Sequence, residues 1–270
     1  MKKTIPASPA GSAVAPAANI IGLVLTVAVS YLSVTGIFNH NTMSQQSARH
    51  PSLFTPAPWA FSIWGLIYLA LAGFAVFQAR NNDEARQLRS RIGGWFLLSC
   101  VANGCWVIAW MYDLTGLSVL LMAGLLFSLL MIVIRTDMEL TDPPLRTIAF
   151  VWWPFCLYSG WITVALLANI AAVIGGGAAS QAASEGDLAA AVAIVMTLIA
   201  GIVCLLMTWR RNMREYALVG AYALVAVGVA DWHRAPAVSW TTFVVAGILF
   251  LSSGWHAWKN RAYSPFRRRD

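Results

Sequence analysis

Eight apolar segments, each about as long as a bilayer is thick, constrain this chain more than any other feature of its sequence. They lie at residues 19–38, 58–79, 92–112, 114–134, 147–175, 187–209, 214–232 and 237–258. A helix needs about 20 residues to cross about 30 Å of hydrocarbon. Lipid provides no partners for backbone N–H and C=O groups, so such segments must be helical. The sequence therefore predicts an all-α, polytopic integral membrane protein, a bundle of about eight transmembrane helices.

The composition excludes an ordinary soluble domain. Hydrophobic residues make up 59% of the chain and charged residues only 11%, whereas a soluble domain has about 25% charged residues. The first apolar run, 19–38, is longer than the apolar core of about 7–15 residues that is typical of a signal peptide. We therefore interpret it as a retained span.

The basic residues predict an orientation. If the N-terminus is cytoplasmic and the spans alternate, Arg49 and Arg234 are the two outer basic residues, and the other sixteen of the 18 Lys and Arg residues lie inside. Such asymmetry is typical of the positive-inside rule. It predicts that both termini are cytoplasmic, in what we expect to be the bacterial inner membrane. Contact with anionic membrane lipid accounts for the positive charge, so we predict no nucleic-acid partner.

The spans lack the groups that catalysis or ion coupling requires. All carboxylates lie in loops or at span ends, and no Lys or Arg lies in the middle of a span. General acid–base chemistry and proton relays both need such groups beside the substrate or within the bilayer. We therefore expect neither an enzyme nor an ion-driven pump.

We also predict no metal site and no redox role. Three histidines in outer segments, His40, His50 and His233, could hold a metal or a haem iron, but chance placement in loops is the interpretation we prefer. The four cysteines lie in apolar segments and form no CxxC motif, so we expect them to pack as small hydrophobic residues; they are Cys100, Cys105, Cys156 and Cys204.

The second span opens with an unusual group of aromatic residues. Phe61, Trp64 and Tyr68 fall on one face of a helix, just after Trp59. This strip is either a packing seam or a wall on which a flat ligand stacks. Trp64 also lies well inside its span, where an indole N–H needs a hydrogen-bond partner.

Two other spans carry polar residues near an interior tryptophan. In the third, Asn103 and Trp106 lie three residues apart and share a face, although Asn103 could simply bond to a neighbouring helix. In the fifth, Trp161 and Asn169 are eight residues apart and face roughly the same way. Pro154, earlier in this span, predicts a kink.

At these residues the chain resembles the tryptophan-rich sensory protein family, also called the translocator protein or TspO/MBR family. The second helix of that family opens with a Pro-Ser-x-Thr-Pro-Pro-x-Trp-x-Phe stretch followed by Trp and Tyr, to which PSLFTPAPWAFSIWGLIY is similar. Its third helix has Asn-x-x-Trp, as at Asn103 and Trp106, and its fifth has Trp-x7-Asn, as at Trp161 and Asn169. The spacing departs before Thr55, between Trp59 and Trp64, and between Pro154 and Trp161. The chain resembles a divergent, extended member.

The resemblance implies a domain organisation. Residues 18–176 would form the TspO/MBR-like five-helix bundle, and 187–260 would add three transmembrane helices that have no counterpart in it. Flexible residues 1–17 and basic residues 261–270 would be cytoplasmic tails, and Gly175–Gly177 would form a flexible exit from the bundle. The additional helices could form an interface, such as that of a homodimer, or complete a translocation path.

The resemblance also implies a function. We expect a membrane receptor or sensor that binds a flat hydrophobic ligand, such as a porphyrin, haem or a sterol, in a cavity of the bundle, with no cofactor required. The implied lining comprises Trp59, Phe61, Trp64, Tyr68, Asn103, Trp106, Trp161 and Asn169. Two alternatives stay open: a permease for a small apolar or neutral solute, and a structural or regulatory partner of another membrane protein.

Overall fold

The computed structural model describes residues 16–141, 143–175 and 184–260, and all secondary structure in these ranges is helical. Residues 1–15 of the predicted N-terminal tail, the tail 261–270 and most of the predicted glycine-rich exit therefore lie outside the described residues, whereas residues 16 and 17 begin α1. The apolar helices are close to the predicted segments: α1 (Pro16–Leu32), α3 (Ile63–Gln78, preceded by the 3-10 helix η1, Pro58–Ser62), α5 (Trp95–Met111), α6 (Thr115–Arg135), α8 (Trp153–Gly175), α9 (Ser184–Arg211), α10 (Arg214–Ala230) and α11 (Pro236–Lys259).

Five helical stretches in the described ranges are long and apolar enough to cross a membrane. They become six if α4 (Asp83–Ile92) and α5, which are bent by 55° relative to each other, are taken as one broken span. Helices α1 and α10 have 17 residues each. The polytopic helical membrane bundle is confirmed, and the count of eight spans stays a prediction.

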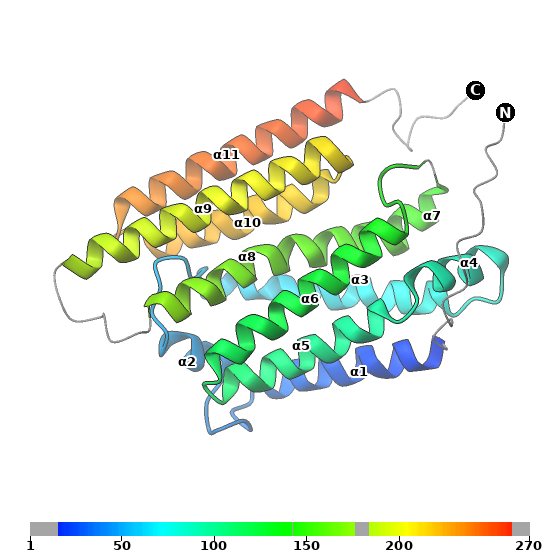
Figure 1. Ribbon diagram of the computed structural model, residues 1–270, viewed down its shortest axis with the longest axis horizontal. Coiled ribbons are helices and arrows are strands. Elements are labelled where there is room, and N and C mark those ends of the chain that lie inside the picture. Colours follow the sequence, from blue (N-terminus) through cyan, green and yellow to red (C-terminus); the bar gives the residue numbers. More distant parts are fainter. Residues whose placement is uncertain (1–15, 142, 176–183, 261–270) are drawn as a thin grey trace.

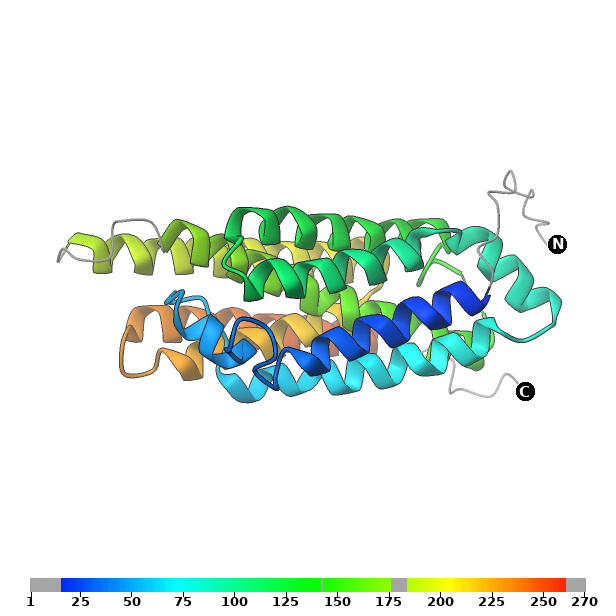
Figure 2. The same cartoon turned by 90° about the horizontal axis from the view of Figure 1, so that it is seen from below.

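The helices run roughly along the long axis of the molecule, with α9–α11 on one side and α1 and α5 on the other (Figure 1). Helix α8 packs against both α6 and α10, and so joins the two sides. The short helix α2 (Met43–Ala48) lies at one end of the bundle and α4 at the opposite end, as the turned view also shows (Figure 2). We call these the α2 end and the α4 end.

Close contact between α8 and α10 depends on a glycine. A Cβ atom at Gly160 would lie 2.7 Å from the backbone oxygen of Tyr216, which has no freedom to move aside. Small residues at helix crossings let backbones approach closely, and this packing drives helix association in lipid. Gly160 therefore holds the C-terminal helices against the rest of the bundle.

Two predicted segments have irregular backbone. The run 19–38 is helical only as far as Leu32, and the turns that follow include positive φ angles at Gly36 (78°) and, just after the run, Asn39 (53°), which a right-handed helix does not contain. Before Pro154, where a kink was predicted, α7 (Leu145–Thr147) continues into a π-helical turn over Ile148–Trp152 (η2) and then into α8. Proline in the first turn of α8 has no N–H to contribute, and this position requires none.

The segment between α3 and α5 contains a helix, α4 (Asp83–Ile92), which the apolar pattern of the sequence did not predict. Helix α4 is capped by the side chain of Asn82 and ends at Gly93, whose φ is 57°. Every described arginine and lysine other than Arg49 and Arg234 lies at this α4 end. Ion pairs link its loops, including Arg146–Glu84 at 2.6 Å and Arg91–Asp137 at 3.2 Å.

Candidate functional site: an aromatic cavity at the α2 end

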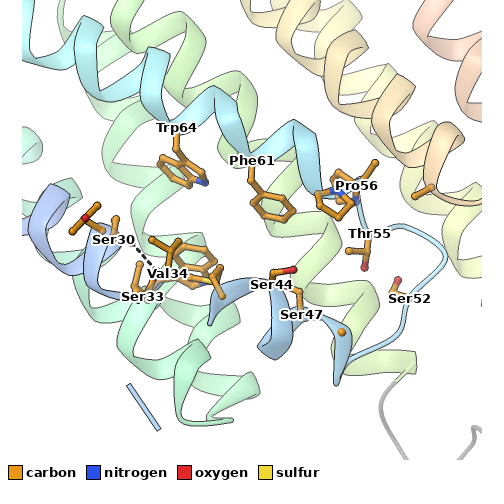
Figure 3. Close-up of a pocket in the computed structure, with 18 of the residues that line it drawn as sticks. Ser30, Ser33, Val34, Ser44, Ser47, Ser52, Thr55, Pro56, Phe61 and Trp64 are labelled. Atoms are coloured by element: carbon orange, nitrogen blue, oxygen red, sulfur yellow. Dashed lines mark hydrogen bonds between the residues drawn. The ribbon is translucent and has the colours of Figure 1, made fainter. Parts of the chain in front are cut away.

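The α2 end contains a cavity of about 780 Å³. Its walls come from the C-terminal part of α1, α2, the segment 51–58, α3, α5 and the turn that follows α10. Figure 3 shows Phe61 and Trp64 pointing from η1 and α3 into this space, opposite Ser44 and Ser47 of α2. Ligand cavities of about 300–1,000 Å³ accommodate drug-sized molecules.

Trp64 is the centre of the aromatic wall. Its ring stacks on Tyr68 at 5.3 Å between centroids and on Trp106 at 6.4 Å, with interplanar angles of 25° and 26°. It meets Trp161 edge-on at 6.3 Å. The spacing of 61, 64 and 68 thus produces the predicted strip, and the strip borders the cavity. Indole faces at such positions can stack on a flat ring of a ligand.

Hydroxyl groups form the opposite wall. Ser30 and Ser33 come from the end of α1 and the turn after it, Ser44 and Ser47 from α2, and Thr55 from the segment before η1. The hydroxyls of Ser30 and Tyr68 lie 2.7 Å apart and form a hydrogen bond that joins the two walls. One face of the cavity is therefore aromatic and the other can donate or accept hydrogen bonds.

A smaller cavity of about 50 Å³ continues from the first toward α6 and α8. Phe61, Trp64 and Trp106 border both spaces, and Trp161 and Asn169 border only the smaller one. The indole N–H groups of Trp106 and Trp161 are buried and have no hydrogen-bond partner in the protein. A buried donor without a partner costs about 1–3 kcal/mol, so each of these groups would be stabilised by an acceptor atom within hydrogen-bond distance of it.

Helix α2 is held in place by an acidic residue in the turn after α5. The Asp113 carboxylate accepts hydrogen bonds from Gln46 Nε2 at 2.5 Å and from His50 Nε2 at 2.8 Å. The hydrogen bond from His50 lowers the pKa of Asp113 below its usual value, and Gln46 adds to the effect. The ring of His50 also packs on Trp110 at 5.1 Å. These contacts fix α2 as a wall of the cavity.

The structure brings together six of the eight predicted lining residues. Phe61, Trp64, Tyr68 and Trp106 border the main cavity, and Trp161 and Asn169 border the smaller one. Asn103 lies behind the wall, where its Nδ2 donates to the Tyr158 hydroxyl at 2.7 Å and its Oδ1 is buried without a partner. The Asn169 amide lies 3.5 Å from Met122 Sδ.

Trp59 lies apart from the other predicted lining residues and borders neither cavity. Its side chain is 47% exposed and meets Tyr222 of α10 edge-on at 5.4 Å. Residues Pro58–Ser62 form a 3-10 helix, which has three residues per turn. Trp59 and Phe61 are two residues apart, so their side chains point to different sides of this short helix, and Trp59 packs on α10 and not on the cavity.

Several cavity residues were not predicted. The serines of α1 and α2 carry no sequence signal beyond their polarity, because their role depends on how residues 33–57 fold back over α3 and α5. Arg234, which also borders the main cavity, had a weak signal as one of the two basic residues outside the predicted cytoplasmic segments. Tyr158, which hydrogen-bonds to Asn103 behind the wall, was not predicted either.

The three outer histidines do not converge among the described residues, and the absence of a metal site stays a prediction. His50 pairs with Asp113, while His40 and His233 are exposed. Within the described part of the chain, the one group of side chains whose ligand atoms converge, within 4.8 Å, consists of Glu139, Cys156 and Glu215 at the α4 end. Burial, together with the neighbouring Glu215, raises the pKa of Glu139 to about 8, so its carboxyl is largely protonated at neutral pH. That the cysteines have no functional role stays a prediction.

Comparison with known proteins gives one match. A family model described as TSPO-like protein matches residues 16–255. The match extends through α9 and α10 and most of α11, and is longer than the resemblance found from the motifs, which ended near residue 175. No curated protein and no solved structure matches the chain.

Proposed function

The chain belongs to the TSPO-like protein family, and from this premise we propose that it is a receptor or sensor that binds a flat aromatic ligand, of the porphyrin class, in the cavity at the α2 end. The family suggests a membrane-embedded ligand-binding protein. The ligand class is our inference from the site, and we place the protein in the bacterial inner membrane with both termini cytoplasmic.

One observation carries the proposal. The main cavity has a stacked aromatic wall around Trp64, and beside this wall the indole N–H groups of Trp106 and Trp161 are buried without partners in the protein. A packing seam would favour side chains without such donors, because each unpaired donor is costly. A flat molecule could stack on Trp64. An acceptor atom on it, such as a ring nitrogen or a carbonyl oxygen, could pair with an unpaired indole N–H.

Binding accounts for the site better than permeation does. Toward the α4 end, the same helices pack Phe74, Phe96 and Phe155 against one another with none of these side chains exposed. A solute that entered at the α2 end would meet this packed layer. The sequence also provides no ionisable group in the middle of a span that could couple transport to an ion.

The test is equilibrium binding of protoporphyrin IX to the purified full-length protein in detergent, followed through the absorbance of the porphyrin. We expect saturable binding that weakens about two- to tenfold in Trp64→Leu and Trp161→Leu, since a stacking contact contributes about 0.5–1.5 kcal/mol beyond burial. Trp258→Leu, at the far end of α11, should leave the affinity unchanged. Equal weakening in all three variants would indicate partition into the micelle, and the proposal would fail.

A further inference from the structure

The turn after α10 is part of the cavity wall, although the sequence resemblance assigned it to additional helices of unknown role. Ala230 and Arg234 both border the main cavity. Two hydrogen bonds attach α10 to the segment that forms the opposite rim: Ala57 N donates to Ala226 O at 3.0 Å, and the Tyr222 hydroxyl donates to Ala60 O at 3.2 Å. The C-terminal helices therefore contribute to the site itself.

Arg234 gives this wall its charge. Among the described residues that border the main cavity, Arg234 is the one charged side chain, and all the others are apolar, aromatic or hydroxylic. It is also one of the two basic residues at the α2 end. A guanidinium group carries five N–H donors and stays charged at any physiological pH, so it attracts an acid group of a ligand.

Asp231, the ion-pair partner of Arg234, leaves most N–H donors of the guanidinium group free to bind a ligand. The contact between Arg234 and Asp231 is 3.5 Å, longer than the 2.7–2.9 Å that is typical of a charge-assisted hydrogen bond. The Asp231 side chain is only 1% exposed and neither of its oxygens has a hydrogen-bond partner, whereas the Arg234 side chain is 60% exposed. Asp231 keeps the arginine at the cavity without saturating it.

We propose that Arg234 anchors an acid group of the ligand, so that the ligand class is a flat aromatic acid whose ring lies on the wall around Trp64 and whose carboxylate pairs with the guanidinium. This inference rests on the proposed function and narrows it. It assigns a role to the C-terminal helices, which complete the binding site and select against neutral molecules of the same shape. A sterol-like ligand without an acid group would not use this contact.

The test compares protoporphyrin IX with its dimethyl ester, which has the same ring but no carboxylate. We expect wild-type protein in detergent to bind the acid about five- to tenfold more tightly than the ester, because Arg234 is partly exposed and its charge is screened by solvent. Arg234→Gln should abolish this preference by lowering the affinity for the acid to about that for the ester, and Arg234→Lys should retain part of it. The matched control is Arg210→Gln, an exposed arginine near the C-terminal end of α9 that borders neither cavity.

Each other outcome overturns the proposal in a recognisable way. Equal affinity of wild-type protein for acid and ester, with saturable binding of both, rejects the anchor but leaves the proposed function standing. Equal loss of both ligands in Arg234→Gln indicates a structural role. If vesicles of an anionic phospholipid displace the acid but not the ester, and vesicles of a neutral phospholipid displace neither, Arg234 is a contact for a lipid headgroup. Saturable binding of neither probe rejects the proposed function as well.

Discussion

The two ends of the bundle use the same helices in opposite ways. Near the α4 end, Phe74 of α3 packs against Phe96 of α5 and Phe155 of α8, each at 4.9 Å between ring centroids. Near the α2 end, Trp64 of α3 lies 6.3–6.4 Å from the rings of Trp106 and Trp161 and borders open space. One aromatic cluster is closed and the other surrounds a cavity.

The difference lies in the chemistry of the rings. The phenylalanine side chain has no polar atom, so a buried edge-to-face pair leaves no hydrogen-bonding group without a partner. Each tryptophan adds an N–H, and two of those at the α2 end have no partner in the protein. An aromatic cluster deep in this bundle is thus a packing element where it consists of Phe, and a candidate binding element where it consists of Trp around a cavity.

The largest effect is expected from removing a ring of the closed cluster. Phe74→Ala should lower the free energy of unfolding by about 3 kcal/mol, because its surroundings can collapse only partly around the space left behind. Titration of the detergent-solubilised protein with sodium dodecyl sulfate, followed by circular dichroism, measures the change. Leu69→Ala, on the exposed side of the same helix, is the control and should have little effect. Comparable losses in the two variants would contradict the assignment of Phe74 to the core.

A smaller effect is expected from Trp161→Phe, which makes the tryptophan cluster at the α2 end chemically more similar to the phenylalanine cluster near the α4 end. Trp161→Phe removes a buried N–H that has no partner and keeps an aromatic ring. Without ligand, the loss of the unpaired donor offsets the loss of ring area, so stability should stay within about 1 kcal/mol of wild type, while affinity for protoporphyrin IX should fall. The control is Trp95→Phe. The Trp95 ring packs on Phe127 away from both cavities, so this variant should bind protoporphyrin IX with unchanged affinity. Unchanged binding in Trp161→Phe would remove Trp161 from the site.

The position of α2 should depend on pH. The pKa of Asp113 is lowered in the folded protein, first by the hydrogen bond from His50. A carboxyl with a depressed pKa contributes stability above its unfolded pKa, and this contribution is lost as the pH falls through the folded value. In acid, α2 should therefore detach more often from the turn after α5.

Tryptic cleavage after Arg49 measures this detachment. At neutral pH, Asp113→Asn should increase the cleavage rate about fivefold, since a partly exposed charged contact contributes about 1 kcal/mol. Asparagine tolerates the positive φ of 60° at this position, so the variant changes the charge without adding backbone strain. Asp83→Asn, in an ion pair with Arg86 at the other end of the molecule, should not alter cleavage after Arg49.

A pH effect of the opposite sign is expected at Glu139 near the α4 end. Its folded pKa of about 8 lies above the ordinary value for a glutamate, so folding binds a proton that the unfolded chain has released. Stability should consequently decrease as the pH rises from about 5 to about 8. Glu139→Gln should flatten this part of the pH profile of thermal unfolding and change little at pH 5. A profile identical to wild type would show that Glu139 does not titrate there.

Local sequence periodicity determined much of this protein. The apolar segments predicted the long helices, and the 61–64–68 spacing predicted which side chains of α3 share a face. The residues near Asn103, Trp106, Trp161 and Asn169 pointed to the family that the longer match confirms. Each of these inferences depends on residues within a few turns of one another, where helix geometry alone fixes the relative directions of side chains.

Only the tertiary structure decided which groups meet. The sequence could not show that Trp59 packs on Tyr222 of α10, because residues 59 and 222 are brought together only by the packing of whole helices. Nor could it bring Ser44 of α2 and Arg234 of the α10–α11 turn to one wall, since they are separated by almost 200 positions in the chain. The contact between α8 and α10 at Gly160 and the hydrogen bonds around Asp113 set these distances. They depend on how whole helices pack, and periodicity within one helix carries no information about that.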